Sequence, residues 1–107
     1  MDINERVDRS RHTGILDLSY SKMGATELAN LLVGISLTEL DLSDNGITDD
    51  GITEIAKSLE PGLLVLKLYN NYITERGIAE VTSASLEFLD WSNNRIRTIS
   101  SNGTNIS

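Results

Sequence analysis

Residues 37–47 read LTELDLSDNGI, and the same pattern occurs three more times in the chain. It returns as TGILDLSYSKM from residue 13, LLVLKLYNNYI from residue 63 and LEFLDWSNNRI from residue 86. In each copy two apolar residues flank one outward position, which is the period-two signature of a strand with one buried face. One such strand cannot bury its leucines alone, but stacked coils can. The repeat therefore predicts coils that start near residues 13, 37, 63 and 86, with their strands paired in a parallel sheet.

The spacing of the equivalent leucines supports this prediction. Leu16, Leu40, Leu66 and Leu89 are separated by 24, 26 and 23 positions. A repeat of this length has room for one strand and one return segment. We expect these four leucines to form one continuous buried row.

An asparagine follows three of the four strands at a fixed offset. Asn45, Asn71 and Asn94 stand where the chain must turn off the strand, and Ser21 takes this place in the first copy. The amide group of asparagine can donate to and accept from backbone groups that the turn would otherwise leave unpaired. We expect these asparagines to be structural.

Each coil is predicted to return by a helix, over residues 24–32, 51–59 and 77–85. The second of these segments shows one apolar face at helical spacing, formed by Ile52, Ile55, Ala56 and Leu59. Thr48, with Asp49 and Asp50, provides a candidate start, and Pro61-Gly62 a stop. Gly24, Gly51 and Gly77 are interpreted as return-turn glycines.

Over residues 13–99 these motifs resemble the leucine-rich-repeat family. The segment ITDDGITEIAKSL (47–59) is similar to the subclass with a full helix in each return, to which the ribonuclease inhibitors belong. The resemblance implies an α/β fold: a right-handed solenoid of about four coils, with a parallel β-sheet on the concave face and helices on the convex face. The last coil departs from this subclass, because its end NRIRTIS (94–100) has the style of shorter repeats with little helix.

The two ends differ in how well they cover the repeats. Residues 1–12 are predicted to form an N-terminal capping helix that opens with a capping box of Asp2 and Glu5. Residues 100–107 are predicted to form a polar tail with too little apolar content to cover a row of leucines. We therefore expect an uncovered edge at Leu86, Leu89 and Trp91, where the repeats continue or a second copy of the chain docks. Trp91 is otherwise expected in the core, in place of a leucine.

The outward strand positions supply the candidate binding residues, because the resemblance implies that the concave face is the usual contact surface. Apolar residues occupy several of these positions, and acidic residues surround them. Ordinary strand propensity explains such residues equally well. The candidate protein-binding residues are Ile15, Asp17, Tyr20, Glu39, Asp41, Asp44, Val65, Lys67, Tyr69, Phe88 and Asp90.

The charged residues of this set suggest a ladder of opposite charges across neighbouring strands rather than a metal site. Lys67 is predicted to lie between Asp41 and Asp90 on neighbouring strands, where their charges would neutralise each other. Asp17 lies beside Asp41, but the pair lacks the third ligand that a cation would need. No metal and no cofactor are predicted.

Composition narrows the classes of function. The net charge of −7 disfavours nucleic acid and anionic membranes and favours a basic protein surface as partner. The sequence has no cysteine, and its one histidine, His12, has no nucleophile beside it, so we expect no enzyme activity. The cytoplasm is the expected compartment; bacterial effectors delivered into host cells also use this fold.

The sequence thus predicts a protein–protein interaction module that binds through its concave face. The alternative is a structural unit that self-associates through the uncovered C-terminal edge. A third hypothesis is a regulator of an enzyme such as a GTPase, although no family motif places an arginine for that role.

Overall fold

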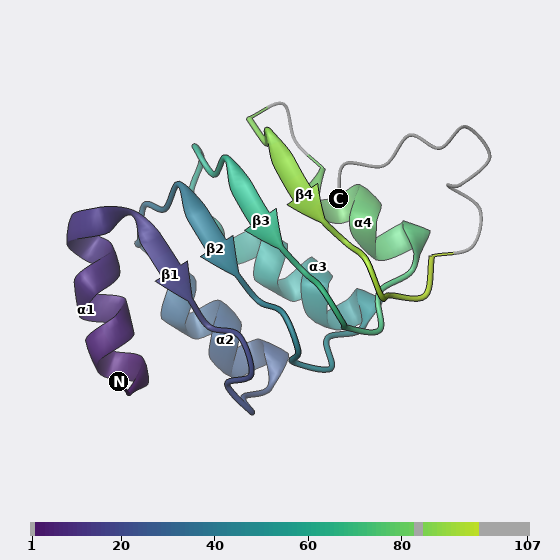
Figure 1. The fold of residues 1–107 in the computed structure, drawn as a ribbon, viewed down its shortest axis with the longest axis horizontal. Helices are drawn as coiled ribbons and strands as arrows, with labels where there is room; N and C mark the ends of the chain where they lie inside the picture. The colour runs from purple at the N-terminus through teal and green to yellow at the C-terminus, as the bar shows by residue number, and fades with distance from the viewer. Residues whose placement is uncertain (1, 83–84, 97–107) are drawn as a thin grey trace.

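Four short parallel strands form one sheet in the computed structural model, which describes residues 2–82 and 85–96 (Figure 1). The order of the strands in the sheet is the order of the strands in the chain, as expected for stacked coils. Within the described residues the strands are β1 (Ile15–Asp17), β2 (Glu39–Asp41), β3 (Val65–Lys67) and β4 (Phe88–Asp90). The predicted parallel sheet is confirmed.

The register of the sheet aligns the repeated leucines. Leu16, Leu40, Leu66 and Leu89 are Cα partners from strand to strand, and none is more than 1% exposed. A second buried row runs beside the first, formed by Leu18, Leu42, Leu68 and Trp91. The expected continuous buried row is therefore confirmed, and the core lies directly under the sheet.

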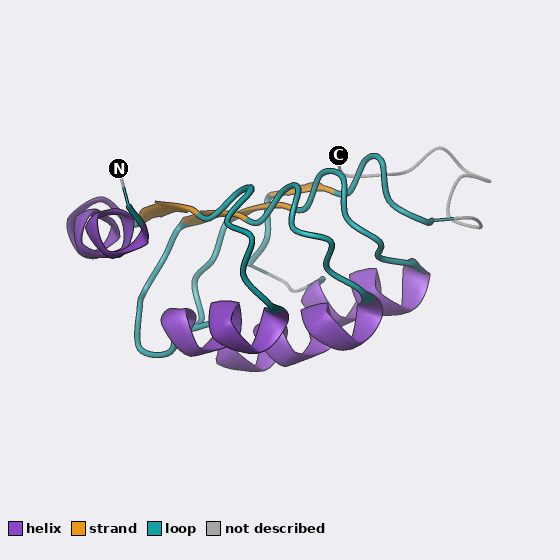
Figure 2. Cartoon of the chain, turned by 90° about the horizontal axis from the view of Figure 1, so that it is seen from below, coloured by secondary structure: helices purple, strands orange, loops and turns teal. Residues whose placement is uncertain are grey.

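Helices α2 (Ala25–Leu32), α3 (Asp49–Ser58) and α4 (Glu75–Val81) cover one side of the sheet. Figure 2 shows them in a separate layer that leaves the other side of the strands without a helix above it. The predicted α/β solenoid of about four coils is confirmed.

The predicted cap at Thr48 is confirmed for α3, whereas the cap of α4 at Thr74 was not predicted; both threonines lie before the glycines. The Thr48 side chain accepts from the N–H of Gly51, and the Thr74 side chain accepts from the N–H of Arg76. Gly51 and Gly77 therefore lie inside the first turns of α3 and α4. Their interpretation as return-turn glycines is wrong.

These two glycines allow neighbouring helices to approach closely. A Cβ atom on Gly51 would lie 3.0 Å from the Cβ of Ala25 in α2, and one on Gly77 would overlap the Asp49 carboxylate and lie 3.0 Å from Cγ2 of Ile52 in α3. Any side chain at Gly77 would force its surroundings apart. The absence of a side chain thus sets the spacing between coils at these points.

The asparagines form the predicted hydrogen bonds from coil to coil. Nδ2 of Asn71 donates to the carbonyl oxygens of Leu42 at 3.1 Å and Leu68 at 3.0 Å. Its Oδ1 accepts from the N–H groups of Asn45 and Ile47, at 3.1 and 2.9 Å. Each asparagine thus satisfies backbone groups of its own coil and of a neighbour.

Helix α1 (Ile3–Thr13) lies beside β1 at one end of the sheet (Figure 1). The predicted capping box is confirmed, because the N–H of Glu5 donates to the Asp2 carboxylate at 2.8 Å and the N–H of Asp2 donates to Glu5. Val7 is buried in the core, and Nη1 of Arg6 donates to the carbonyl oxygen of Asp17 at 3.1 Å. The helix therefore packs against the outer strand.

The expected uncovered edge at Leu86, Leu89 and Trp91 is wrong for Leu89, in β4, and for Trp91, which follows it. Leu89 is 1% exposed and Trp91 is 8% exposed, while Leu86 is half-buried. The side chains of Leu89 and Trp91 belong to the same core cluster as Leu66 and Leu68, because the last coil continues the buried rows of the preceding one. The core interpretation of Trp91 is confirmed. The polar tail predicted at 100–107 lies outside the described residues.

Candidate functional site

The side of the sheet that carries no helix displays the outward side chains of the four strands. We call this surface the open sheet face; its residues are Ile15, Glu39, Val65 and Phe88 in one row, and Asp17, Asp41, Lys67 and Asp90 in the next. The residues within each row are Cα partners across neighbouring strands, as the repeat predicts. The sheet thus brings these candidate residues together on one surface.

Apolar side chains on the open sheet face are accessible to solvent. Ile15 is 52% exposed, Phe88 is 39% exposed, and Val65 between them is half-buried. Tyr69, which follows β3, is also exposed. Single exposed apolar residues are common on proteins, but several along one row form a surface that a partner can desolvate.

The charged residues of the open sheet face pair differently from the prediction. Nζ of Lys67 lies 3.2 Å from Oε2 of Glu39, on the diagonal across β2 and β3. The predicted ladder of Lys67 with Asp41 and Asp90 is wrong, although these residues are its neighbours in register. Both side chains of the observed pair are partly exposed, so the pair contributes little to stability.

The aspartates of the open sheet face form hydrogen bonds with the backbone of the turn that follows each strand. The carboxylates of Asp17, Asp41 and Asp90 accept from the N–H two residues later, at 2.9, 2.9 and 3.0 Å. In each case the donor is a serine: Ser19, Ser43 or Ser92. The recurring D-x-S pattern in the sequence is the signal for this turn, and the sequence analysis did not use it.

Asp17 shows the electrostatic consequence of this turn. Burial raises the pKa of its carboxyl group, but hydrogen bonds from the hydroxyl and N–H of Ser19, together with the charges of Arg6 and Lys67, outweigh that effect. The pKa of Asp17 is therefore lowered from its ordinary value of 3.8. The group stays charged at neutral pH and keeps this end of the open sheet face acidic.

A second polar row follows the ends of the strands. Asp44, Asn70 and Asn93 have φ values of 59–61°, in the left-handed region that asparagine and aspartate tolerate best. Nδ2 of Asn93 donates to Oδ1 of Asn70, and Nδ2 of Asn70 donates to Asp44, both at 2.6 Å. These side chains satisfy one another.

Tyr20 occupies the equivalent position in the first coil and is 70% exposed. Nζ of Lys22 lies 5.8 Å from the centroid of its ring. Tyr20 therefore offers an exposed aromatic ring at the margin of the open sheet face. Asp44, another of the eleven candidate residues, instead accepts a hydrogen bond from the side chain of Asn70.

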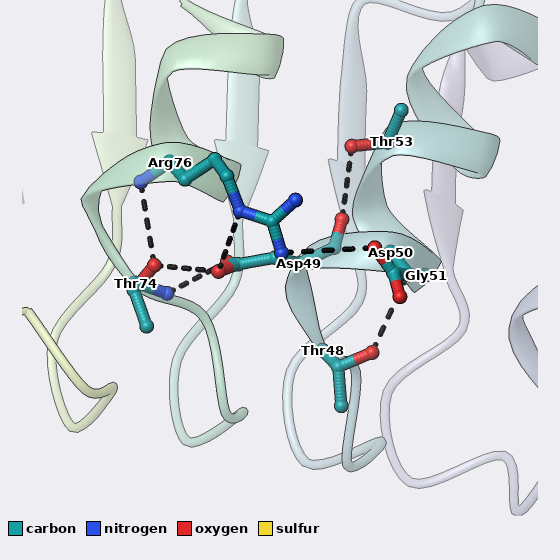
Figure 3. A network of polar contacts seen from close by, with 7 residues as sticks. All are labelled: Thr48, Asp49, Asp50, Gly51, Thr53, Thr74 and Arg76. Atoms are coloured by element: carbon teal, nitrogen blue, oxygen red, sulfur yellow. Dashed lines mark hydrogen bonds and ion pairs between the residues drawn. The ribbon is translucent and has the colours of Figure 1, made fainter.

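A cluster around Asp49 links α3 to α4 on the other side of the molecule (Figure 3). The Asp49 carboxylate accepts from the N–H of Thr74 at 2.8 Å and from its hydroxyl at 2.5 Å, and it lies 3.6 Å from Nε of Arg76. Burial raises the pKa of Asp49, but these partners and the N–H of Gly77 outweigh it and lower the pKa from 3.8. The sequence analysis recognised Asp49 only as a helix-start residue. The contact with the next coil was missed because it joins positions 25 residues apart.

Within residues 2–82 and 85–96, no group of three or more histidine, cysteine, aspartate or glutamate side chains could hold a metal ion. In the same part of the chain, no helix has the length and apolar character needed to cross a membrane. The polar groups described above are turn-forming and helix-linking residues.

Comparison with known families finds the repeat in two places. One family model, described as Leucine Rich repeat, matches residues 35–56, which contain β2 and the first part of α3. A second, described as Leucine Rich Repeat, matches residues 85–105, which contain β4. No curated protein matches the chain. Neither match identifies the subclass with a full helix in each return.

Proposed function

This chain is a leucine-rich-repeat protein, and since domains of this family generally mediate protein–protein interaction, we propose that it binds a partner protein through its open sheet face. The observation that carries the proposal is the exposure of Ile15 and Phe88 on the side of the sheet that no helix covers. Removing this apolar surface from water favours association by roughly 25 cal/mol for each Å² buried.

The charge of the open sheet face supports a basic partner. Asp17, Asp41 and Asp90 are negative, and the one lysine of the face is paired with Glu39. An acidic surround speeds the encounter with a basic surface and disfavours acidic partners. The apolar and aromatic side chains then supply the contact area that holds the complex together.

The test compares two variants that remove aromatic rings from different surfaces. The Tyr69→Ala, Phe88→Ala double variant removes two rings from the open sheet face and its margin. The control Tyr72→Ala removes an exposed ring that packs on Arg95, in the turn after Asn71. Each chain is used to capture proteins from its cognate lysate, and quantitative mass spectrometry measures the yield.

We expect proteins captured by the wild-type chain and by the control to fall more than tenfold with the double variant, because aromatic anchors carry most of an interface's energy. Circular dichroism checks that all three chains keep their helices. Equal capture by the double variant would reject the open sheet face as the binding surface.

Neither competing hypothesis gains support. Self-association through the C-terminal edge required Leu89 and Trp91 to be exposed, and both are buried. Regulation of an enzyme such as a GTPase required a positioned arginine. Arg76 instead pairs with Asp49 and Asp50, and Arg95 stacks on Tyr72.

A further inference from the structure

A hollow of about 380 Å³ opens beside the carboxyl ends of α3 and α4, next to the turns that lead into β3 and β4. This volume falls within the range of roughly 300–1,000 Å³ that is typical of ligand sites. Its apolar lining consists of Ala56, Leu59, Leu63, Val81 and Leu86. None of these residues belongs to the open sheet face.

The two coils that line the hollow differ in length. The coil that contains α3 spans 26 positions between equivalent leucines, and the coil that contains α4 spans 23. Helix α3 has 10 residues, whereas α4 has 7. The longer coil supplies Pro61 and Gly62 to the lining and the shorter coil supplies Glu80 and Val81, so the hollow lies where two coils of unequal length meet.

The margin of the hollow is negative. Glu60 and Glu80 line it, and both are exposed. Within residues 2–82 and 85–96, no lysine or arginine forms an ion pair with either of them. The carboxyl end of α4 adds the negative end of a helix dipole with no basic residue in its last turn, while Lys57 offsets that effect at α3.

An apolar lining with carboxylates at its margin suits one kind of side chain. Lysine and arginine pack their methylene groups on apolar surface and keep their charged heads at the water. We propose that this hollow receives a lysine or arginine side chain of a partner protein, with its methylene groups against Leu59 and Val81 and its charge beside Glu60 and Glu80. The site is separate from the open sheet face and can be tested without knowing the partner.

The probe is hexylammonium, a six-carbon chain with one positive charge. Hexanoate and 1-hexanol are its matched anionic and neutral controls. Each is titrated into the full ¹⁵N-labelled chain, and amide chemical shifts are followed. Hexylammonium should give saturable shifts at Leu59, Leu63 and Leu86, and hexanoate should give none. Equal shifts with 1-hexanol, or no saturable shift with hexylammonium, would overturn the proposal.

Three variants test the location. Glu60→Gln and Glu80→Gln should each raise the Kd for hexylammonium about two- to fivefold, as expected for a solvent-exposed ion pair. Asp8→Asn removes a carboxylate from α1 and should leave the Kd unchanged. Ala56→Leu fills the hollow and should abolish saturation, with amide spectra confirming the fold. An unchanged Kd in Ala56→Leu, or nuclear Overhauser contacts that show residues 97–107 in the hollow, would also overturn the proposal.

Discussion

At the scale of single residues, the Asp49 carboxylate has polar partners in the next coil, at Thr74 and Arg76. Asp49 is the first residue of α3, yet its carboxylate caps the start of α4 through Thr74. A carboxylate placed before a helix also interacts favourably with the helix dipole. One side chain therefore fixes where the next coil begins its helix.

We predict that Asp49→Asn lowers the free energy of unfolding by about 1–3 kcal/mol at pH 7, because an amide cannot accept both Thr74 bonds with the strength of a carboxylate. The lowered pKa of Asp49 means that its contribution is present above about pH 4 and is lost as the pH falls through the pKa of the folded state. The difference between wild type and variant should therefore narrow on acidification.

Urea unfolding from pH 7 to pH 2 measures this difference. Asp50→Asn is the control, because Asp50 also contacts Arg76 but is almost fully exposed, so its removal should change little. If the difference between wild type and Asp49→Asn stays constant with pH, the carboxylate does not have the role assigned to it.

At the scale of elements, an asparagine side chain holds the turn after each of β2, β3 and β4. Asn71 is 2% exposed, and its side chain bonds to five backbone groups in two coils. Replacing it would leave buried donors and acceptors without partners, which costs more than the hydrogen bonds themselves contribute.

We predict that Asn71→Ala lowers the free energy of unfolding by about 3 kcal/mol or more. The control Asn30→Ala changes an exposed residue of α2 and should be neutral or slightly stabilising, since alanine is the better helix former. Denaturant unfolding measures both. A loss below about 1 kcal/mol for Asn71→Ala would show that water replaces the amide in the turn.

The same scale shows how far the sequence could be read in advance. The strand register and the asparagine bonds were predictable, because the strand pattern recurs in all four coils and the asparagine recurs at a fixed offset in three of them. The ion pair of Lys67 with Glu39 was not, because it joins neighbouring coils on the diagonal, a contact that the repeat pattern does not specify. The start of α4 was missed for a similar reason: the cap at Thr74 depends on Asp49 of another coil.

At the scale of the whole molecule, each coil contacts chiefly its neighbours. Helix α3 packs between α2 and α4, and each of the four described strands pairs only with the strands of adjacent coils. Yet the buried residues form one cluster from Val7 in α1 to Trp91 after β4. In long repeat proteins the terminal coils can unfold separately from the rest. Four coils that share one core are expected to unfold together, because no coil keeps a complete core without its neighbours.

We therefore predict that the chain unfolds in one transition. Trp91, the single tryptophan, reports on the last coil, and its emission should shift to longer wavelength as its buried ring meets water. Far-UV circular dichroism reports on all the helices. The two urea midpoints should coincide in the wild type and shift together in Asn71→Ala, because the lost hydrogen bonds join the middle coils of one cooperative unit. A Trp91 transition at lower urea than the helical one would mean that the last coil opens independently, and the domain would then behave as a one-dimensional array.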